Sequence, residues 1–234
     1  MTDIFCYNVQ EVIIMPDIKT LLLTIFVLTS VLHLYASWRD DKRLRGITKP
    51  FLLAFLAAYS LVSSDFRVSW LSLALIACWL GDILLIPKGH GWFTAGGVSF
   101  AIAHVLFILV YAERVDFASV PYFVIVPVAL IYFAAGLWVI RAIKDTTPKP
   151  MVVPMYLYLI ANATMNVFAL MLALSGAEKG AVIAYVGAAL FFLSDCALFI
   201  VRYHSRRDIV PKRHFTVMLA YLLGVLYITL GIAG

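Results

Sequence analysis

Two aspartates lie inside apolar stretches of this sequence, where a charged side chain is hardest to accommodate. Asp82 falls in the run Leu-Gly-Asp-Ile-Leu-Leu at 80–85, and Asp195 falls in a similar run, Leu-Ser-Asp-Cys-Ala-Leu, at 193–198. A charge at bilayer depth costs at least ~2.5–3.5 kcal/mol, so such residues mark functional sites by default. Two carboxyl groups in an apolar cavity can divide the work of acid and base. The pair therefore predicts acid–base hydrolysis, with structural hydrogen bonding between helices as the alternative.

Other polar residues fall close enough along the chain to be candidates for substrate binding. Lys49 stands at the start of an apolar run and could meet a phosphate, and His104 lies in the middle of another run. Tyr158 and Asn162 share one face of a predicted helix, because residues four apart are neighbours on the helix surface. For each of them the alternative is structural: a hydrogen bond between helices, or a lysine that snorkels to the membrane interface.

Sequence patterns for other chemistries are absent. The chain contains no phosphate-binding loop, GxSxG, HExxH or paired CxxC pattern. These patterns would indicate nucleotide binding, a serine nucleophile or a zinc site. The predicted chemistry therefore requires no metal and no cofactor.

The composition is that of an integral membrane protein. Of the 234 residues, 64% are hydrophobic and only 13% are charged, whereas a soluble domain carries about 25% charged residues. The net charge of +5 resides in short loops between apolar segments, as the positive-inside rule and anionic lipids explain. We therefore expect membrane lipids as partners and no nucleic acid.

The apolar runs predict an all-α membrane protein with eight transmembrane helices in a single domain, residues 1–234. Each run approaches the ~20 residues that a membrane-spanning helix requires. A β-barrel would show alternating segments of about ten residues instead. The spans are predicted at residues 18–38, 48–64, 68–86, 93–112, 121–140, 151–174, 181–201 and 215–232.

The distribution of basic residues predicts the orientation of a multi-pass protein, in the inner membrane if the source is bacterial. Fourteen of the 18 Lys and Arg residues fall in the first, third, fifth and seventh loops, and four fall elsewhere. The positive-inside rule then places these loops in the cytoplasm and both termini outside it. In this topology Asp82 and Asp195 lie at similar depth in the cytoplasmic half and are predicted to face one shared cavity.

A faint internal repeat relates the two halves. Lys49-Pro50 precedes the second span as Lys149-Pro150 precedes the sixth, and an aspartate lies near the end of the third and seventh spans. The matches favour a 4+4 parallel repeat about an axis along the membrane normal, with coincidence between short stretches as the alternative.

Taken in order, these motifs resemble the YhhN family over nearly the whole chain. One departure is Val225, four residues after Tyr221, where such proteins tend to carry Gln, so a polar contact from the last helix is in doubt. The motifs are Thr48-Lys49-Pro50, Gly81-Asp82, Phe100-xxx-His104, Pro154-xxx-Tyr158 followed by Met165, and Gly187-Ala188-xx-Phe191-xx-Ser194-Asp195.

The resemblance implies an intramembrane hydrolase, because characterised members of the family include the lysoplasmalogenases. Such an enzyme uses water to cleave the vinyl ether of a lysophospholipid substrate. The products are a fatty aldehyde and glycerophosphoethanolamine or glycerophosphocholine. Protonation of the alkenyl carbon gives an oxocarbenium ion that water traps, so an acid, a base and a placed water suffice. The family aspartates fall on Asp82 and Asp195, and the implied substrate-binding residues are Lys49, His104, Tyr158, Asn162 and Ser194.

Two other functions fit the same aspartates: a proton-coupled transporter of a small molecule or lipid, and a non-catalytic scaffold. A transporter would favour helices broken at corresponding positions of both halves. Pro127 and Pro154 lie inside spans, and neither has a counterpart in the first half. This favours the hydrolase, and it leaves open which aspartate is the acid.

Overall fold

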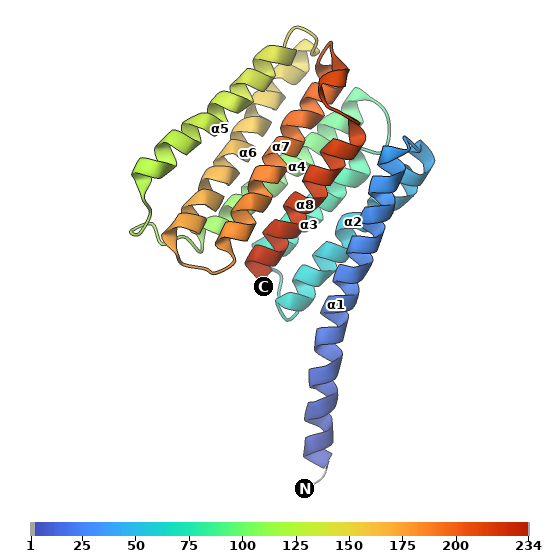
Figure 1. Ribbon diagram of the computed structural model, residues 1–234, viewed down its shortest axis with the longest axis vertical. Coiled ribbons are helices and arrows are strands. Elements are labelled where there is room, and N and C mark those ends of the chain that lie inside the picture. The colour runs from blue at the N-terminus through green and yellow to red at the C-terminus, as the bar shows by residue number, and fades with distance from the viewer. Residues whose placement is uncertain (1–2, 234) are drawn as a thin grey trace.

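The computed structural model describes the backbone of residues 3–233 and the side chains of residues 18–206 and 208–233. Eight α-helices and one short 3-10 helix make up its regular structure (Figure 1). They are α1 (Asp3–Trp38), α2 (Lys42–Ser63), α3 (Trp70–Leu84), α4 (His90–Ala112), α5 (Tyr122–Ile143), α6 (Lys149–Ser175), α7 (Ala181–Tyr203), η1 (Arg207–Ile209) and α8 (His214–Ala233).

The predicted all-helical membrane architecture is confirmed, with one helix shorter than expected. Seven helices are long and apolar enough to cross a membrane. The exception, α3, has 15 residues, or ~22 Å at 1.5 Å per residue, whereas the sequence predicts a helix over 68–86. It begins after Ser69, whose hydroxyl accepts the N–H of Ser72. It ends before Pro87, because the residue preceding a proline disfavours helical backbone.

The second helix begins earlier than predicted, at Lys42 rather than Thr48. Asp41 caps it: one carboxylate oxygen accepts the N–H groups of Arg43 and Leu44, each at 3.0 Å. This capping satisfies backbone donors that would otherwise lack a partner at a helix start. Much of the predicted basic loop is therefore the first two turns of α2.

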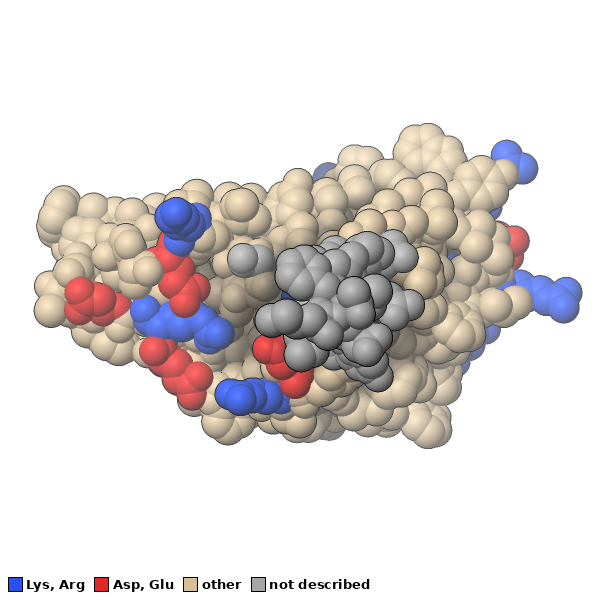
Figure 2. All heavy atoms as spheres, turned by 90° about the horizontal axis from the view of Figure 1, so that it is seen from below, with Lys and Arg blue, Asp and Glu red and all other residues tan. Residues whose placement is uncertain are grey.

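Both ends of the chain lie at the same end of the helical bundle (Figure 1). The basic connections α1–α2, α3–α4, α5–α6 and α7–α8 lie at the opposite end. Figure 2 shows the end near the termini, where Lys, Arg, Asp and Glu side chains gather over one side. There an ion pair of 3.2 Å between Arg114 and Glu178 links the end of α4 to the α6–α7 turn.

Helices α7 and α8 pack in backbone contact, because glycines face each other along their interface. A Cβ atom on Gly187 would lie 2.6 Å from the Gly224 carbonyl oxygen, and one on Gly224 would lie 2.9 Å from the Gly187 oxygen. Small residues of this kind allow close helix approach in membranes, where no hydrophobic force drives association. The contact fixes α8 beside α7 and so sets the position of Tyr221 in the bundle.

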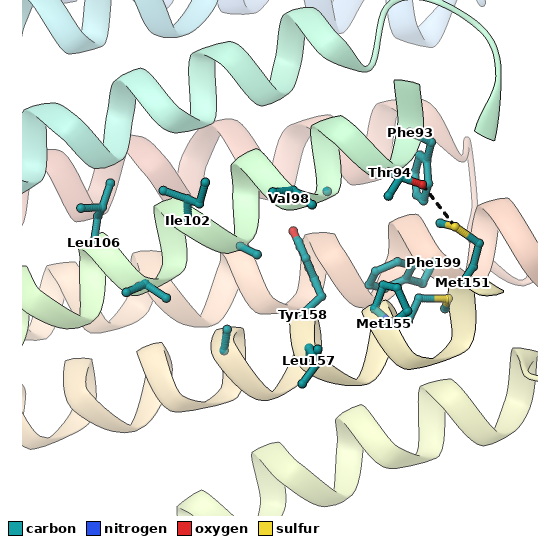
Figure 3. A pocket seen from close by; sticks show the side chains of 15 residues that line it. Phe93, Thr94, Val98, Ile102, Leu106, Met151, Met155, Leu157, Tyr158 and Phe199 are labelled. Carbon is teal, nitrogen blue, oxygen red and sulfur yellow. Dashed lines mark hydrogen bonds between the residues drawn. The ribbon is translucent and has the colours of Figure 1, made fainter. Parts of the chain in front are cut away.

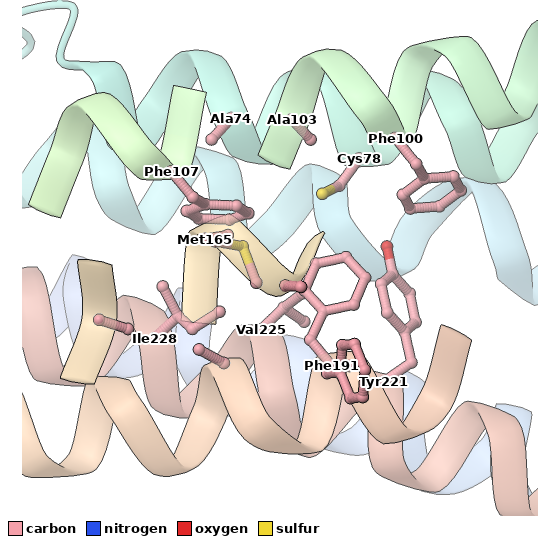
Figure 4. Packing of buried hydrophobic residues seen from close by; sticks show 14 of the residues in the cluster. Ala74, Cys78, Phe100, Ala103, Phe107, Met165, Phe191, Tyr221, Val225 and Ile228 are labelled. Atoms are coloured by element: carbon pink, nitrogen blue, oxygen red, sulfur yellow. The ribbon is translucent and has the colours of Figure 1, made fainter. Parts of the chain in front are cut away.

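The interior between these helices is aromatic. Figure 4 shows Phe100, Cys78, Phe191 and Tyr221 facing one another where α3, α4, α7 and α8 meet. Hydrogen bonds between helices add specificity: the Trp79 indole N–H donates to the Pro50 carbonyl oxygen at 2.6 Å, joining α3 to α2. The core therefore holds α2, α3, α4, α7 and α8 in fixed relative positions around the polar groups described next.

Candidate functional site

The first buried carboxylate forms a cluster of three residues from three helices, the Asp82 cluster. Its Oδ1 lies 3.3 Å from the Nζ of Lys49 on α2, and its Oδ2 accepts the hydroxyl of Tyr221 on α8 at 2.9 Å. Asp82 is only 2% exposed. Gly81, the preceding residue, lets α4 approach, since a Cβ there would lie 2.7 Å from the Phe100 ring. A buried ion pair and a hydroxyl thus satisfy both oxygens.

The second carboxylate is held by neutral donors, in what we call the Asp195 cluster. Its Oδ2 accepts the hydroxyl of Tyr158 at 2.8 Å and the side-chain amide of Asn162 at 2.7 Å, both from α6. The Nε2 of His104 on α4 lies 3.4 Å from the same oxygen, outside hydrogen-bond geometry. His104 is fully buried. Three groups therefore converge on one oxygen of Asp195.

A second asparagine orients the first. The Asn166 side-chain amide donates to both the side-chain oxygen and the carbonyl oxygen of Asn162, each at 3.0 Å. Because the Asn162 oxygen is thereby occupied as an acceptor, its NH₂ group is the end that faces Asp195. Asn166 thus positions a donor of the cluster.

One aromatic layer separates the two clusters. The Phe191 ring centroid lies 5.1 Å from that of His104 and 5.3 Å from that of Tyr221. Phe191 therefore contacts one residue of each cluster, and a cavity shared by the two aspartates stays a prediction.

The Asp195 cluster adjoins an apolar groove between α4 and α6, with a volume of about 550 Å³. Figure 3 shows Tyr158 rising from α6 into the middle of this groove, with Phe93 near one end and Leu106 at the other. The span from Phe93 to Leu106 on α4 corresponds to ~20 Å of helix. Tyr158 thus has its ring on the groove and its hydroxyl on Asp195.

The structure brings most of the predicted site residues together and places Ser194 apart from them. His104, Tyr158 and Asn162 surround Asp195, and Lys49 contacts Asp82. Ser194 instead donates to the Val217 carbonyl oxygen at 2.9 Å, a contact between α7 and α8. No three His, Cys, Asp or Glu side chains in the described part of the chain are grouped to hold a metal ion.

Tyr221 is the residue that sequence reasoning missed. A polar contact from the last helix was in doubt because Val225 replaces a glutamine, but Tyr221 itself supplies that contact to Asp82. The position of Tyr221 along its helix could have indicated this contact. Tyr221 lies seven residues into α8, ~10 Å from the bundle end that carries the basic loops, and Asp82 lies near the same end.

The fold and these clusters define a polytopic helical membrane protein with a polar site buried among its helices. The family model of the YhhN family matches residues 44–232, and the chain therefore belongs to the YhhN family. The match includes every residue of both clusters. Comparison with curated proteins and with solved structures gave no match.

Proposed function

We propose that the protein is an intramembrane hydrolase that cleaves the vinyl ether of lysoplasmalogen-type lysophospholipids. The products would be a fatty aldehyde and glycerophosphoethanolamine or glycerophosphocholine. Membership of the YhhN family supports this class of reaction. The observation that carries the proposal is the contact between the Asp195 cluster and the apolar groove, made through Tyr158.

The groove suits a single aliphatic chain. Its lining is almost entirely apolar, and its volume lies within the ~300–1,000 Å³ of small-molecule sites. Because Tyr158 stands midway along it, a chain lying in the groove passes directly over a hydroxyl bonded to a buried carboxylate. An alkenyl group at this point would meet a proton donor in a groove whose lining is otherwise almost entirely apolar.

The two clusters differ in the proton that they can hold. Asp82 and Lys49 form a neutral pair when both are ionised, which is the form an ion pair favours. Asp195 and His104 form a neutral pair only when they hold one proton between them, and burial of net charge is costly. We therefore assign the transferable proton to the Asp195–His104 pair.

The reaction then follows from this proton. The pair delivers it through the Tyr158 hydroxyl to the alkenyl carbon farther from the ether oxygen, and the double-bond electrons form the new C–H bond. Water adds to the oxocarbenium carbon and returns a proton to the pair, leaving a hemiacetal. Collapse of the hemiacetal breaks the carbon–oxygen bond and releases the aldehyde and the glycerol hydroxyl. No proton is consumed overall, and acid–base catalysis of this kind contributes ~10²–10⁴-fold.

We extend the proposal to the topology. Helix α3 connects opposite ends of the bundle (Figure 1), which supports eight crossings, and the basic loops support non-cytoplasmic termini. The contacts also support the 4+4 repeat. Asp82 on α3 is contacted from α2 and α8, and Asp195 on α7 is contacted from α6 and α4. In a 4+4 repeat, α3 corresponds to α7, α2 to α6 and α4 to α8, so the two aspartates are contacted from corresponding helices.

The test is incubation of the purified protein with 1-alkenyl, 1-alkyl and 1-acyl lysophospholipids in heavy water. We expect aldehyde from the alkenyl lipid alone, with one deuterium on the carbon next to the carbonyl, because that carbon receives the acid's proton. Release of a fatty acid from the acyl lipid, or no aldehyde from the alkenyl lipid of either headgroup, would contradict the proposed reaction.

A further inference from the structure

A second cavity, of about 510 Å³, lies at the end of the bundle that carries the basic loops. The ends of α4, α7 and α8 and the α5–α6 connection line it. Its basic side chains are His90, Arg202, Arg213 and His214, and Thr146 and Tyr203 add hydroxyl groups. We call this cavity the basic pocket.

The basic pocket adjoins the apolar groove, because Arg202 of the pocket packs on Phe93 of the groove. The guanidinium carbon of Arg202 lies 3.7 Å from the centroid of the Phe93 ring, and Phe93 lines the groove. Tyr203, also in the pocket wall, packs edge-on to Phe93 with the ring centroids 6.0 Å apart. Phe93 is thus the partition between an apolar and a basic compartment.

The two arginines have no carboxylate partner. Among the side chains that the structure describes, neither Arg202 nor Arg213 forms an ion pair with Asp or Glu. Lys49, the predicted phosphate ligand, has its ammonium group on Asp82 instead. Arg202 is thus a positive charge that contacts the groove wall at Phe93 and has no carboxylate partner among the described side chains.

We propose that the basic pocket binds the phosphate of an amphiphile whose chain lies in the α4–α6 groove, with Arg202 and Arg213 as its ligands. The guanidinium group suits this role because its planar fork of donors matches the oxygens of a phosphate. This inference rests on the proposed function and identifies a headgroup subsite for it. It makes the headgroup phosphate, rather than the chain alone, the feature that selects the substrate.

The spacing along α7 agrees with this arrangement. Asp195 precedes Arg202 by seven residues, ~10 Å along the helix axis. A phosphate at Arg202 is separated from the alkenyl group by the glycerol unit, which bridges the interval towards Tyr158 and Asp195. The rest of the chain then extends past Tyr158 towards Leu106 (Figure 3).

The test is direct binding, so that it does not depend on catalysis. The protein in nanodiscs of uncharged lipid is titrated with a fluorescent 1-alkyl lysophosphatidylcholine, which has no alkenyl bond to hydrolyse, and with the matching 1-alkylglycerol. We expect the phospholipid to bind at least roughly tenfold more tightly, the order of effect of one charge-assisted contact. Arg202→Gln and Arg213→Gln should each remove much of this preference and leave alkylglycerol binding unchanged.

Arg141→Gln on α5 is the matched control, because Arg141 is exposed and lines neither compartment. Arg202→Lys keeps the charge and loses the planar fork, so its preference for the phospholipid should be intermediate between those of the parent and Arg202→Gln. If Arg202→Gln elutes as an aggregate, Arg202→Lys and Arg213→Gln are the variants that test the proposal. Equal losses in the control and pocket variants, or equal binding of the two ligands by the parent, would overturn the headgroup site. Glycerophosphocholine that competes as well as the lipid would assign the pocket to a soluble phosphate and overturn the lipid assignment. If binding follows the expected pattern and no aldehyde forms, the proposed reaction fails and the headgroup site stands.

Discussion

The Asp82 and Asp195 clusters are built alike and differ in electrical character. In each, an aspartate in the C-terminal half of its helix accepts a tyrosine hydroxyl, at 2.9 Å for Asp82 and 2.8 Å for Asp195. Asp82 also faces a lysine, whereas Asp195 faces an amide and a histidine. The first carboxylate is therefore paired with a cation, and the second is surrounded by neutral donors and an imidazole ring.

Two similar sequence motifs therefore need not contribute equally to the proposed reaction. Only the Asp195 cluster has a member on the groove, since Tyr158 lines it. Tyr221 of the Asp82 cluster and His104 of the Asp195 cluster both pack against the Phe191 ring, which lies between them. We therefore expect Asp195 to carry proton transfer and Asp82 to hold α2, α3 and α8 in place and to supply a nearby negative charge.

The largest expected effect is that of Asp195→Asn. Asparagine keeps the shape and hydrogen bonds but cannot transfer a proton, so aldehyde release should fall by ~10²–10⁴-fold. Asp82→Asn should cost only about tenfold, the equivalent of ~1.4 kcal/mol in the barrier. Turnover of the alkenyl lysophospholipid by folded, monodisperse protein measures both.

Cys196→Ala, beside Asp195 on α7, is the control for handling and folding and should retain most activity. Equal losses for the two aspartate variants would show that both carboxylates take part in proton transfer. Activity of Asp195→Asn within about threefold of the parent, far short of the expected loss, would remove the acid–base mechanism altogether.

The second expected effect is on stability and concerns Lys49. Lys49→Met leaves the Asp82 carboxylate buried without its cation, and breaking a buried pair costs about 3–5 kcal/mol. The thermal unfolding midpoint of the solubilised protein should fall clearly. The double variant Lys49→Met with Asp82→Asn should recover most of the loss, because no unpaired charge remains. Additive losses in the double variant would mean that the two side chains are not coupled.

Arg45→Met is the matched control for this pair. Arg45 lies one turn before Lys49 on the same helix and pairs with the exposed Asp40 at 3.0 Å. The Arg45 side chain is only 14% exposed, but its partner Asp40 is 70% exposed, so removal of Arg45 leaves no carboxylate buried. This variant should therefore lower the midpoint less than Lys49→Met. A loss as large as that of Lys49→Met would point to the α1–α2 end itself and not to the buried pair.

The sequence was sufficient to predict the membrane class, the helical fold and most of the residues that gather around the two aspartates, for identifiable reasons. Membrane helices satisfy their backbone internally and must be apolar, so the spans stand out. A buried charge is costly, so Asp82 and Asp195 stand out as well. The end of α3 at Leu84 and the early start of α2 depend on caps and a proline, local features that hydropathy does not report.

What the sequence could not supply was partnership between helices. The contacts Tyr221 to Asp82 and His104 to Asp195 join residues 139 and 91 positions apart in the chain. They depend on helix rotation and on the close α7–α8 approach through Gly187 and Gly224. For the same reason Ser194, adjacent to Asp195, was predicted to bind substrate although its side chain faces α8.

Substitution of the two tyrosines should have smaller effects on stability than Lys49→Met, and it distinguishes the two clusters most clearly. Tyr158→Phe and Tyr221→Phe each delete one hydroxyl bonded to a buried carboxylate, so each should cost about 1–3 kcal/mol of stability.

The effects of Tyr158→Phe and Tyr221→Phe on turnover should differ. Tyr158 meets the groove and relays the proton, so Tyr158→Phe should lower kcat by roughly tenfold to a hundredfold, towards the lower end of the acid–base contribution. Tyr221→Phe should leave kcat within about threefold of the parent, because its hydroxyl serves only as a hydrogen-bond donor to Asp82. A threefold change in rate corresponds to less than half of the activation free energy that a tenfold change represents. Measured kcat values for both variants, at a temperature well below each unfolding midpoint, decide the comparison. Equal falls in kcat would mean that the Phe191 layer does not divide the two clusters functionally, and that Tyr221 and Asp82 belong to the reacting site.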